Sequence, residues 1–144
     1  MDRHILFYLV GRLILVNGLS LIIPLTAGLI WGERGILYFG PSLIAAVAFS
    51  AYCLYRGRHH KRQVGAGEGA WYMVLVWLIL SLLGMVPYVM AGVFTSPADA
   101  FFESVSAFTT TGTSVLADGG ASLPASLLLW HSLMGWLGGL NFIL

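Results

Sequence analysis

Charged residues are scarce in this chain. Asp, Glu, Lys and Arg make up 9% of its 144 residues, whereas a soluble domain carries about 25%. Hydrophobic residues make up 58%, more than a domain this small can hide from water. Four blocks carry no charged residue, and each is at least about the 20 residues that a helix needs to cross a bilayer: 13–32, 35–55, 69–98 and 119–144. The sequence therefore excludes a soluble globular domain and predicts an integral membrane protein.

Cysteine is equally scarce. Cys53 is the only cysteine, and it lies inside an apolar block, so a disulfide framework within the chain is excluded. No spaced set of Cys and His residues has the pattern of a zinc site. His59 and His60 adjoin in a basic run, and we interpret them as ordinary loop residues. We expect no covalently bound cofactor.

Lysine and arginine are concentrated in one place. Four of the seven lie in residues 56–62, directly after the second apolar block. Such a position favours a cytoplasmic loop over a nucleic-acid-binding site, because short loops rich in Lys and Arg stay on the cytoplasmic side. Arg34 is the only Lys or Arg expected on the opposite side. The rule predicts a cytoplasmic N-terminus and an external turn at Gly32–Gly35.

The apolar blocks predict a series of membrane helices. The first runs from about His4 to Trp31, and Pro24 is expected to kink it. After a polar turn the second runs from about Ile36 to Tyr55, so that the two form a helical hairpin. The third runs from about Trp71 to Phe94, and residues 123–144 are long enough to return to the cytoplasmic side.

Several residues inside these blocks interrupt their apolar character. We interpret Arg12 as a residue whose long side chain snorkels to the membrane interface. The alternative, that Arg12 belongs to an ion path, is less favoured. Asn141 is interpreted as a packing contact, or as a contact with another repeat or the permeation path. Gly135, Gly138 and Gly139 are expected to let helices approach closely.

Residues 95–122 do not have the pattern of a simple external loop. Ser96 can cap a helix, Pro97 suits the first helical position, and Asp99 follows three residues after the cap. The apolar pattern then continues to Phe108. A helix of about ten to twelve residues is roughly 15–18 Å long, which is too short to span a bilayer. This segment predicts a re-entrant half-helix.

The half-helix is followed by a run of threonines with one glycine, Thr109–Thr113, which we call the threonine loop. Threonine favours an extended backbone, and Gly112 can take a positive φ. Such a backbone can direct carbonyl oxygens at a dehydrated cation, as in potassium-channel filters. The motif alone is weak, but the order of span, short helix, loop and span predicts a pore-loop unit.

Three motifs together resemble one family: Asp99–Ser104, Thr109–Gly112 and Gly135–Gly139. The chain resembles the N-terminal part of a TrkH-type subunit of the Trk/Ktr/HKT superfamily, over nearly its whole length. The resemblance implies an all-α polytopic membrane protein. Residues 1–64 would form an N-terminal transmembrane hairpin with a basic cytoplasmic loop. Residues 65–144 would form the first of four pore-loop units (membrane helix, pore half-helix, filter loop and membrane helix).

The resemblance also implies a function and a site. The function is potassium ion transport, with K⁺ as substrate and not as a cofactor. Backbone carbonyls of Thr110, Thr111 and Gly112 would coordinate K⁺, and Thr109 and Thr113 would flank them. The implied setting is the bacterial inner membrane, in contact with lipid, as a homodimer with a cytoplasmic nucleotide-binding regulatory subunit. No nucleic-acid partner is expected.

The chain departs from the family pattern in two ways. Leu140–Asn141–Phe142 follows the double glycine where the family usually has Met-Gly and aliphatic residues. The chain also ends at Leu144 after a single pore-loop unit, as a fragment, a truncated product or a partial protein would. One loop presents carbonyls from one side only, so we expect the isolated chain to be inactive as a monomer, with homotetramerisation as the alternative.

Two other functions fit parts of the sequence. A membrane-embedded accessory protein that only packs against a partner needs no ion site. An intramembrane hydrolase would use Ser114 or Thr113 as nucleophile and His131 as base. No orienting acid or glycine frame surrounds Ser114 in the sequence, so we predict that the chain is not an enzyme.

Overall fold

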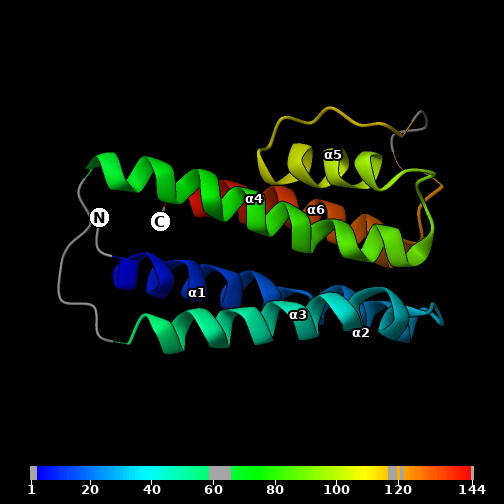
Figure 1. Ribbon diagram of the computed structural model, residues 1–144. Helices are drawn as coiled ribbons and strands as arrows, with labels where there is room; N and C mark the ends of the chain where they lie inside the picture. Colours follow the sequence, from blue (N-terminus) through cyan, green and yellow to red (C-terminus); the bar gives the residue numbers. More distant parts are fainter. Residues whose placement is uncertain (1–2, 59–65, 117–119, 121, 144) are drawn as a thin grey trace.

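The computed structural model of the chain describes residues 3–58, 66–116, 120 and 122–143. Within these residues every regular element is a helix (Figure 1). In chain order the helices are α1 (Arg3–Ser20), α2 (Ile22–Ile30), α3 (Gly35–Arg56), α4 (Ala66–Ala91), α5 (Pro97–Phe108) and α6 (Ala125–Ile143). The predicted all-α fold is confirmed.

The first predicted span is one apolar stretch divided into two helices. α1 ends at Ser20 and α2 begins at Ile22, so the break falls at Leu21. Pro24 explains its place, because a proline has no N–H for the carbonyl of Ser20 and its ring clashes with that carbonyl. The Leu21 N–H bonds the Gly18 carbonyl at 3.1 Å, which tightens the turn. The interruption at Leu21 lies within one turn of Pro24, where the sequence predicted a kink.

α1 and α3 pack side by side as the predicted hairpin (Figure 1). Small residues allow the close approach, since a Cβ added at Gly18 would lie 2.8 Å from the Cβ of Ala46. The connecting turn uses Gly32 with φ +73°, a value that glycine adopts readily.

α4 and α6 lie along each other above the hairpin, and the start of α1 and the end of α6 lie at the same end of the bundle (Figure 1). Among the described residues, three stretches are long and apolar enough to cross a bilayer: Ile5–Ile30, Gly35–Arg56 and Trp71–Ala91. α6 has 19 residues, about 28 Å at the helical rise, but it carries His131 and Asn141 and is not among these three. Its crossing stays a prediction.

The third span ends three residues before its predicted end. Gly92 follows α4 with φ +65°. Its N–H bonds the Val89 carbonyl at 3.1 Å, and the Val93 N–H bonds the Tyr88 carbonyl at 3.3 Å. This pair of bonds is a Schellman motif, which ends a helix where a glycine can turn left-handed.

Two asparagines join the first helix, α1, to the last helix, α6, inside the bundle. The amide of Asn17 in α1 and the amide of Asn141 in α6 each donate to the other, at 3.4 and 3.3 Å, and both side chains are buried. Asn17 also donates to the Leu13 carbonyl at 2.8 Å. A buried amide is costly without hydrogen-bond partners, and each asparagine supplies such a partner to the other. Of the two roles predicted for Asn141, the structure supports helix packing.

Glu33, in the turn between α2 and α3, caps a helix 92 residues away. Its carboxylate accepts from the backbone N–H of Ala125 at 2.8 Å and of Ser126 at 3.1 Å, and from the Ser126 hydroxyl. A carboxylate there satisfies two donors that the first turn of α6 leaves free and complements the helix dipole. The hairpin is thereby tied to the start of α6.

Glu33→Gln is expected to destabilise the chain by about 0.5–2 kcal/mol, the usual range for a lost N-cap. Thermal unfolding of the purified chain in detergent measures this loss. The control is Arg34→Gln, which also removes one charge from the turn but changes an exposed side chain. Equal melting temperatures for the two variants would show that the cap contributes nothing.

Candidate functional site

The predicted half-helix is present as α5. It starts at Pro97, with the Ser96 hydroxyl accepting from the Ala98 N–H at 3.2 Å, and ends at Phe108. Both ends fall where the sequence predicted them. α5 packs against α4 and α6, and the segment that follows it runs back toward the end of the bundle at which α5 began (Figure 1). The chain therefore enters and leaves on the same side, as in a re-entrant loop.

α5 ends in a Schellman motif built on a threonine. The Thr111 N–H bonds the Ser106 carbonyl at 3.0 Å, and the Thr110 N–H bonds the Ala107 carbonyl at 3.1 Å. Thr110 has φ +55° and is the only described non-glycine residue with a positive φ. A β-branched residue seldom adopts this conformation, which costs roughly 1–2 kcal/mol. The extended backbone expected at Thr110 is therefore wrong, because helix termination decides its conformation.

Gly112 has φ +76°, in agreement with the positive φ predicted for the glycine of the threonine loop. Nothing lies within 4 Å of a Cβ placed there. The residues from Thr110 to Thr113 are all exposed. Within the described residues, no hydrogen bond reaches the carbonyl oxygens of Thr110, Thr111 or Gly112. These three oxygens are thus free to bind a ligand from the open side of the loop.

Thr109 and Thr113, which flank these three residues, both have hydrogen-bond partners. The Thr109 hydroxyl lies 2.7 Å from the Val105 carbonyl and 2.8 Å from the Thr111 hydroxyl. The Ser106 hydroxyl donates to the Thr113 carbonyl and lies 3.1 Å from the Thr113 hydroxyl. The Thr113 carbonyl therefore differs from the three before it, since a protein donor already occupies it.

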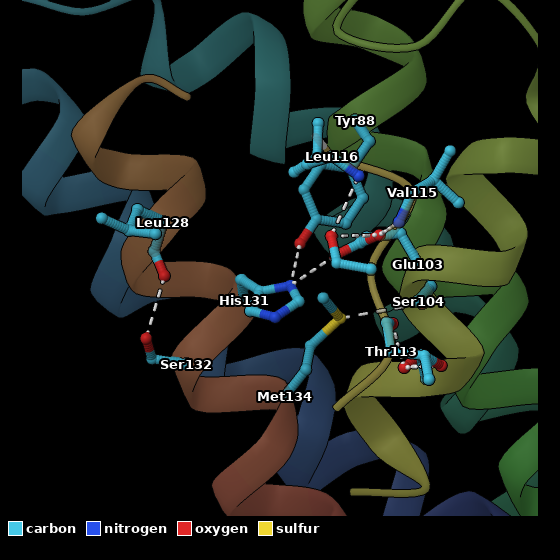
Figure 2. A network of polar contacts seen from close by, with 12 residues as sticks. Tyr88, Glu103, Ser104, Thr113, Val115, Leu116, Leu128, His131, Ser132 and Met134 are labelled. Carbon is cyan, nitrogen blue, oxygen red and sulfur yellow. Dashed lines mark hydrogen bonds and ion pairs between the residues drawn. The ribbon is translucent and has the colours of Figure 1, made fainter. Parts of the chain in front are cut away.

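Behind the loop lies a buried carboxylate, that of Glu103 in α5 (Figure 2). It accepts from the Ser114 hydroxyl at 2.9 and 3.0 Å and from the Val115 N–H at 2.9 Å. The Nδ1 atom of His131 lies 3.6 Å from it, and the Tyr88 hydroxyl lies 3.1 Å from that nitrogen. Side chains of α4, α5 and α6 thus meet the end of the threonine loop at one carboxylate.

The hydrolase interpretation required His131 to contact Ser114 or Thr113, but the Thr113 hydroxyl lies beside the Ser106 hydroxyl. The Ser114 hydroxyl instead donates to Glu103. His131 contacts Glu103 and Tyr88 (Figure 2). A nucleophile that is hydrogen-bonded to a carboxylate and not to its base lacks the geometry of the serine hydrolases. No group of three or more His, Cys, Asp or Glu residues that could hold a metal ion is found among the described residues.

α6 packs closely against the end of α5 at one glycine. A Cβ added at Gly138 would lie 1.9 Å from the carbonyl oxygen of Phe108. Gly135 has its nearest neighbour at 3.7 Å, and Gly139 has none within 4 Å. Of the three glycines predicted to allow close packing, only Gly138 lies where a side chain is impossible.

Sequence reasoning assigned no role to Glu103. The signal was present, because Glu103 stands between Ala100 and Ala107 on the apolar side of a short helix. A carboxylate on a buried face needs donors. Its donors are Ser114 and Val115, and nothing in their residue types distinguishes them from other loop residues.

The sequence is similar to those of known proteins. Residues 39–144 match the family model described as "TrkH: Cation transport protein". The chain is 32% identical over 139 residues to the Trk system potassium uptake protein TrkH of Escherichia coli. It is 29% identical over 143 residues to an uncharacterised cation transporter of Methanocaldococcus jannaschii. These alignments cover 94% and 99% of the chain, but 28% and 29% of the relatives.

A solved structure has the same fold. The crystal structure of the potassium transporter TrkH from Vibrio parahaemolyticus matches with a TM-score of 0.88 and 29% identity, over 99% of this chain and 31% of that one. The chain therefore spans less than a third of the proteins it matches. The family and the structural neighbour are transporters, in agreement with the prediction that the chain is not an enzyme. This integral membrane chain belongs to the TrkH family of cation transport proteins.

Proposed function

We propose that the chain supplies one pore-loop unit of a potassium transporter, in which carbonyl oxygens of Thr110, Thr111 and Gly112 coordinate dehydrated K⁺. One observation carries the proposal: the short helix α5 leads into an exposed loop whose three carbonyls have no hydrogen-bond partner among the described residues. Carbonyl oxygens replace the water around K⁺ in known filters. Thr109 and Thr113 flank the site.

Electrostatics around the loop favour a cation. The carboxyl end of α5 points at the threonine loop, and a helix carries about half a negative charge at that end. This dipole favours K⁺ over an anion at the loop.

The remaining functional parts lie outside this chain. In the proposed arrangement residues 1–64 form an N-terminal hairpin and residues 65–144 the first unit, and further units close the ring around the ion. The names of the relatives support potassium as the transported ion. We propose an inner-membrane homodimer with a cytoplasmic nucleotide-binding regulatory subunit as the complete assembly.

A chimera tests the proposal. Residues 1–144 replace the matching segment of the Escherichia coli relative, and this protein is expressed in bacteria that lack their own potassium uptake systems. We expect growth at low external potassium to be restored. Absence of uptake, with the chimera present in the membrane at the level of the parent, would favour the accessory interpretation, in which the chain only packs against a partner.

The proposed orientation has its own test. Arg34 lies in the predicted external turn, Arg58 lies in the predicted cytoplasmic loop, and both are exposed. In a Cys53→Ala background, Arg34→Cys is expected to react with an impermeant maleimide in intact cells. Arg58→Cys should react only after the membrane is opened, because Lys and Arg concentrate on the cytoplasmic side. The opposite labelling pattern would reverse the topology.

A further inference from the structure

We infer that Glu103 is a positioning residue for the ion site: it fixes the end of the threonine loop and so sets the selectivity of the carbonyls before it. The inference rests on the proposed function. It assigns the control of selectivity to a side chain that does not touch the ion.

The first step is that α5 holds the loop at both ends. At the start, the Schellman bonds join Thr110 and Thr111 to the last turn of the helix. At the far end, Ser106 bonds Thr113, and Glu103 bonds Ser114 and Val115. The free carbonyls of residues 110–112 lie between these two attachments. Their spacing therefore depends on both.

The second step is that the attachment at Glu103 is rigid. Glu103 is 0% exposed, whereas Ser114 and Val115 are exposed. The carboxylate has a fixed partner on the other side, since the His131 Nδ1 lies 3.6 Å away and the Tyr88 hydroxyl lies 3.1 Å from that nitrogen. A buried carboxylate thus holds an exposed segment, and His131 and Tyr88 lie on its other side (Figure 2).

The third step is that no other described side chain holds residues 114–116 to the bundle by a hydrogen bond. The remaining bond of this segment is internal, from the Leu116 N–H to the Ser114 hydroxyl at 3.0 Å. Hydrogen bonds to charged groups are the stronger ones in proteins. Loss of the carboxylate therefore frees the end of the loop while α5, its cap and its Schellman motif remain.

The test uses the chimera with Glu103→Gln, which keeps the shape of the side chain but replaces an acceptor with a donor. Glu103→Leu removes both acceptors, and Ser114→Ala removes one donor from the loop. The matched control is Ser104→Ala. Ser104 is buried next to Glu103, but its hydroxyl contacts the Met134 sulfur at 3.7 Å and not the loop.

The measurement is the ratio of potassium to sodium uptake at equal amounts of protein in the membrane. We expect this ratio to fall about tenfold in Glu103→Gln, the effect of one weakened hydrogen bond to a charged group. The ratio should fall less in Ser114→Ala. The double variant should match Glu103→Gln, because both changes remove the same contact. The control should keep the parental ratio.

Amide exchange of Val115 in the 144-residue chain in detergent supplies an independent readout. It should be at least about tenfold faster in Glu103→Leu and unchanged in Ser104→Ala. If Glu103→Leu does not fold, the uptake ratios of Glu103→Gln and Ser114→Ala still decide. An unchanged ratio in Glu103→Gln would overturn this inference alone. A parental chimera without potassium uptake would overturn the proposed function, and the inference with it.

Discussion

Gly138→Ala is expected to abolish potassium uptake by the chimera and to destabilise the chain. The added Cβ would lie 1.9 Å from the Phe108 carbonyl oxygen, far inside the 3.0 Å that such contacts need. That oxygen belongs to the backbone at the end of α5, so it cannot rotate away as a side chain would. α6 and α5 must separate, and overpacking of this kind costs about 1–3 kcal/mol or more.

The matched control for this substitution is Gly139→Ala. It lies one residue further along α6, and nothing is found within 4 Å of its added Cβ. At a helical position with free space, alanine stabilises the helix by about 0.5–1 kcal/mol relative to glycine. The two substitutions should therefore shift the melting temperature in detergent in opposite directions. Uptake equal to the parent in Gly138→Ala would show that the contact with Phe108 is not needed.

The part of this fold that local sequence signals determine was predictable. Ser96 and Pro97 fixed the start of α5, Gly112 fixed a positive φ, and Pro24 fixed the break in the first span. Each feature depends on the covalent geometry of one residue and its near neighbours. Such constraints act in any tertiary context, which explains why the sequence alone was sufficient.

The features that sequence reasoning missed depend on contacts between distant residues. Glu33 caps α6 from 92 residues away, and Asn17 pairs with Asn141 across 124. Every helix start offers free N–H groups and every membrane asparagine needs a partner, so residue types do not say which of them meet. Thr110 was missed for another reason, because its preference for an extended backbone is weaker than the bonds that end α5.

Gly112→Ala is the substitution expected to separate selectivity from folding. A left-handed conformation costs a non-glycine residue roughly 1–2 kcal/mol, or about 5- to 30-fold in the population of the native loop conformation. Gly112 has φ +76° and lies in open space. The substitution should therefore change the direction of the neighbouring carbonyls without any clash. In the chimera, potassium uptake relative to sodium should fall several-fold at a normal level of protein in the membrane.

Gly92→Ala makes the comparison decisive. Gly92 has φ +65° and nothing within 4 Å of an added Cβ, but it ends α4 and lies outside the threonine loop. Both substitutions impose a similar backbone cost and should lower the melting temperature in detergent by similar amounts. If the carbonyls of residues 110–112 coordinate potassium, only Gly112→Ala changes the potassium-to-sodium ratio. Equal ratios in the two variants would mean that the loop serves folding and that the ion is coordinated elsewhere.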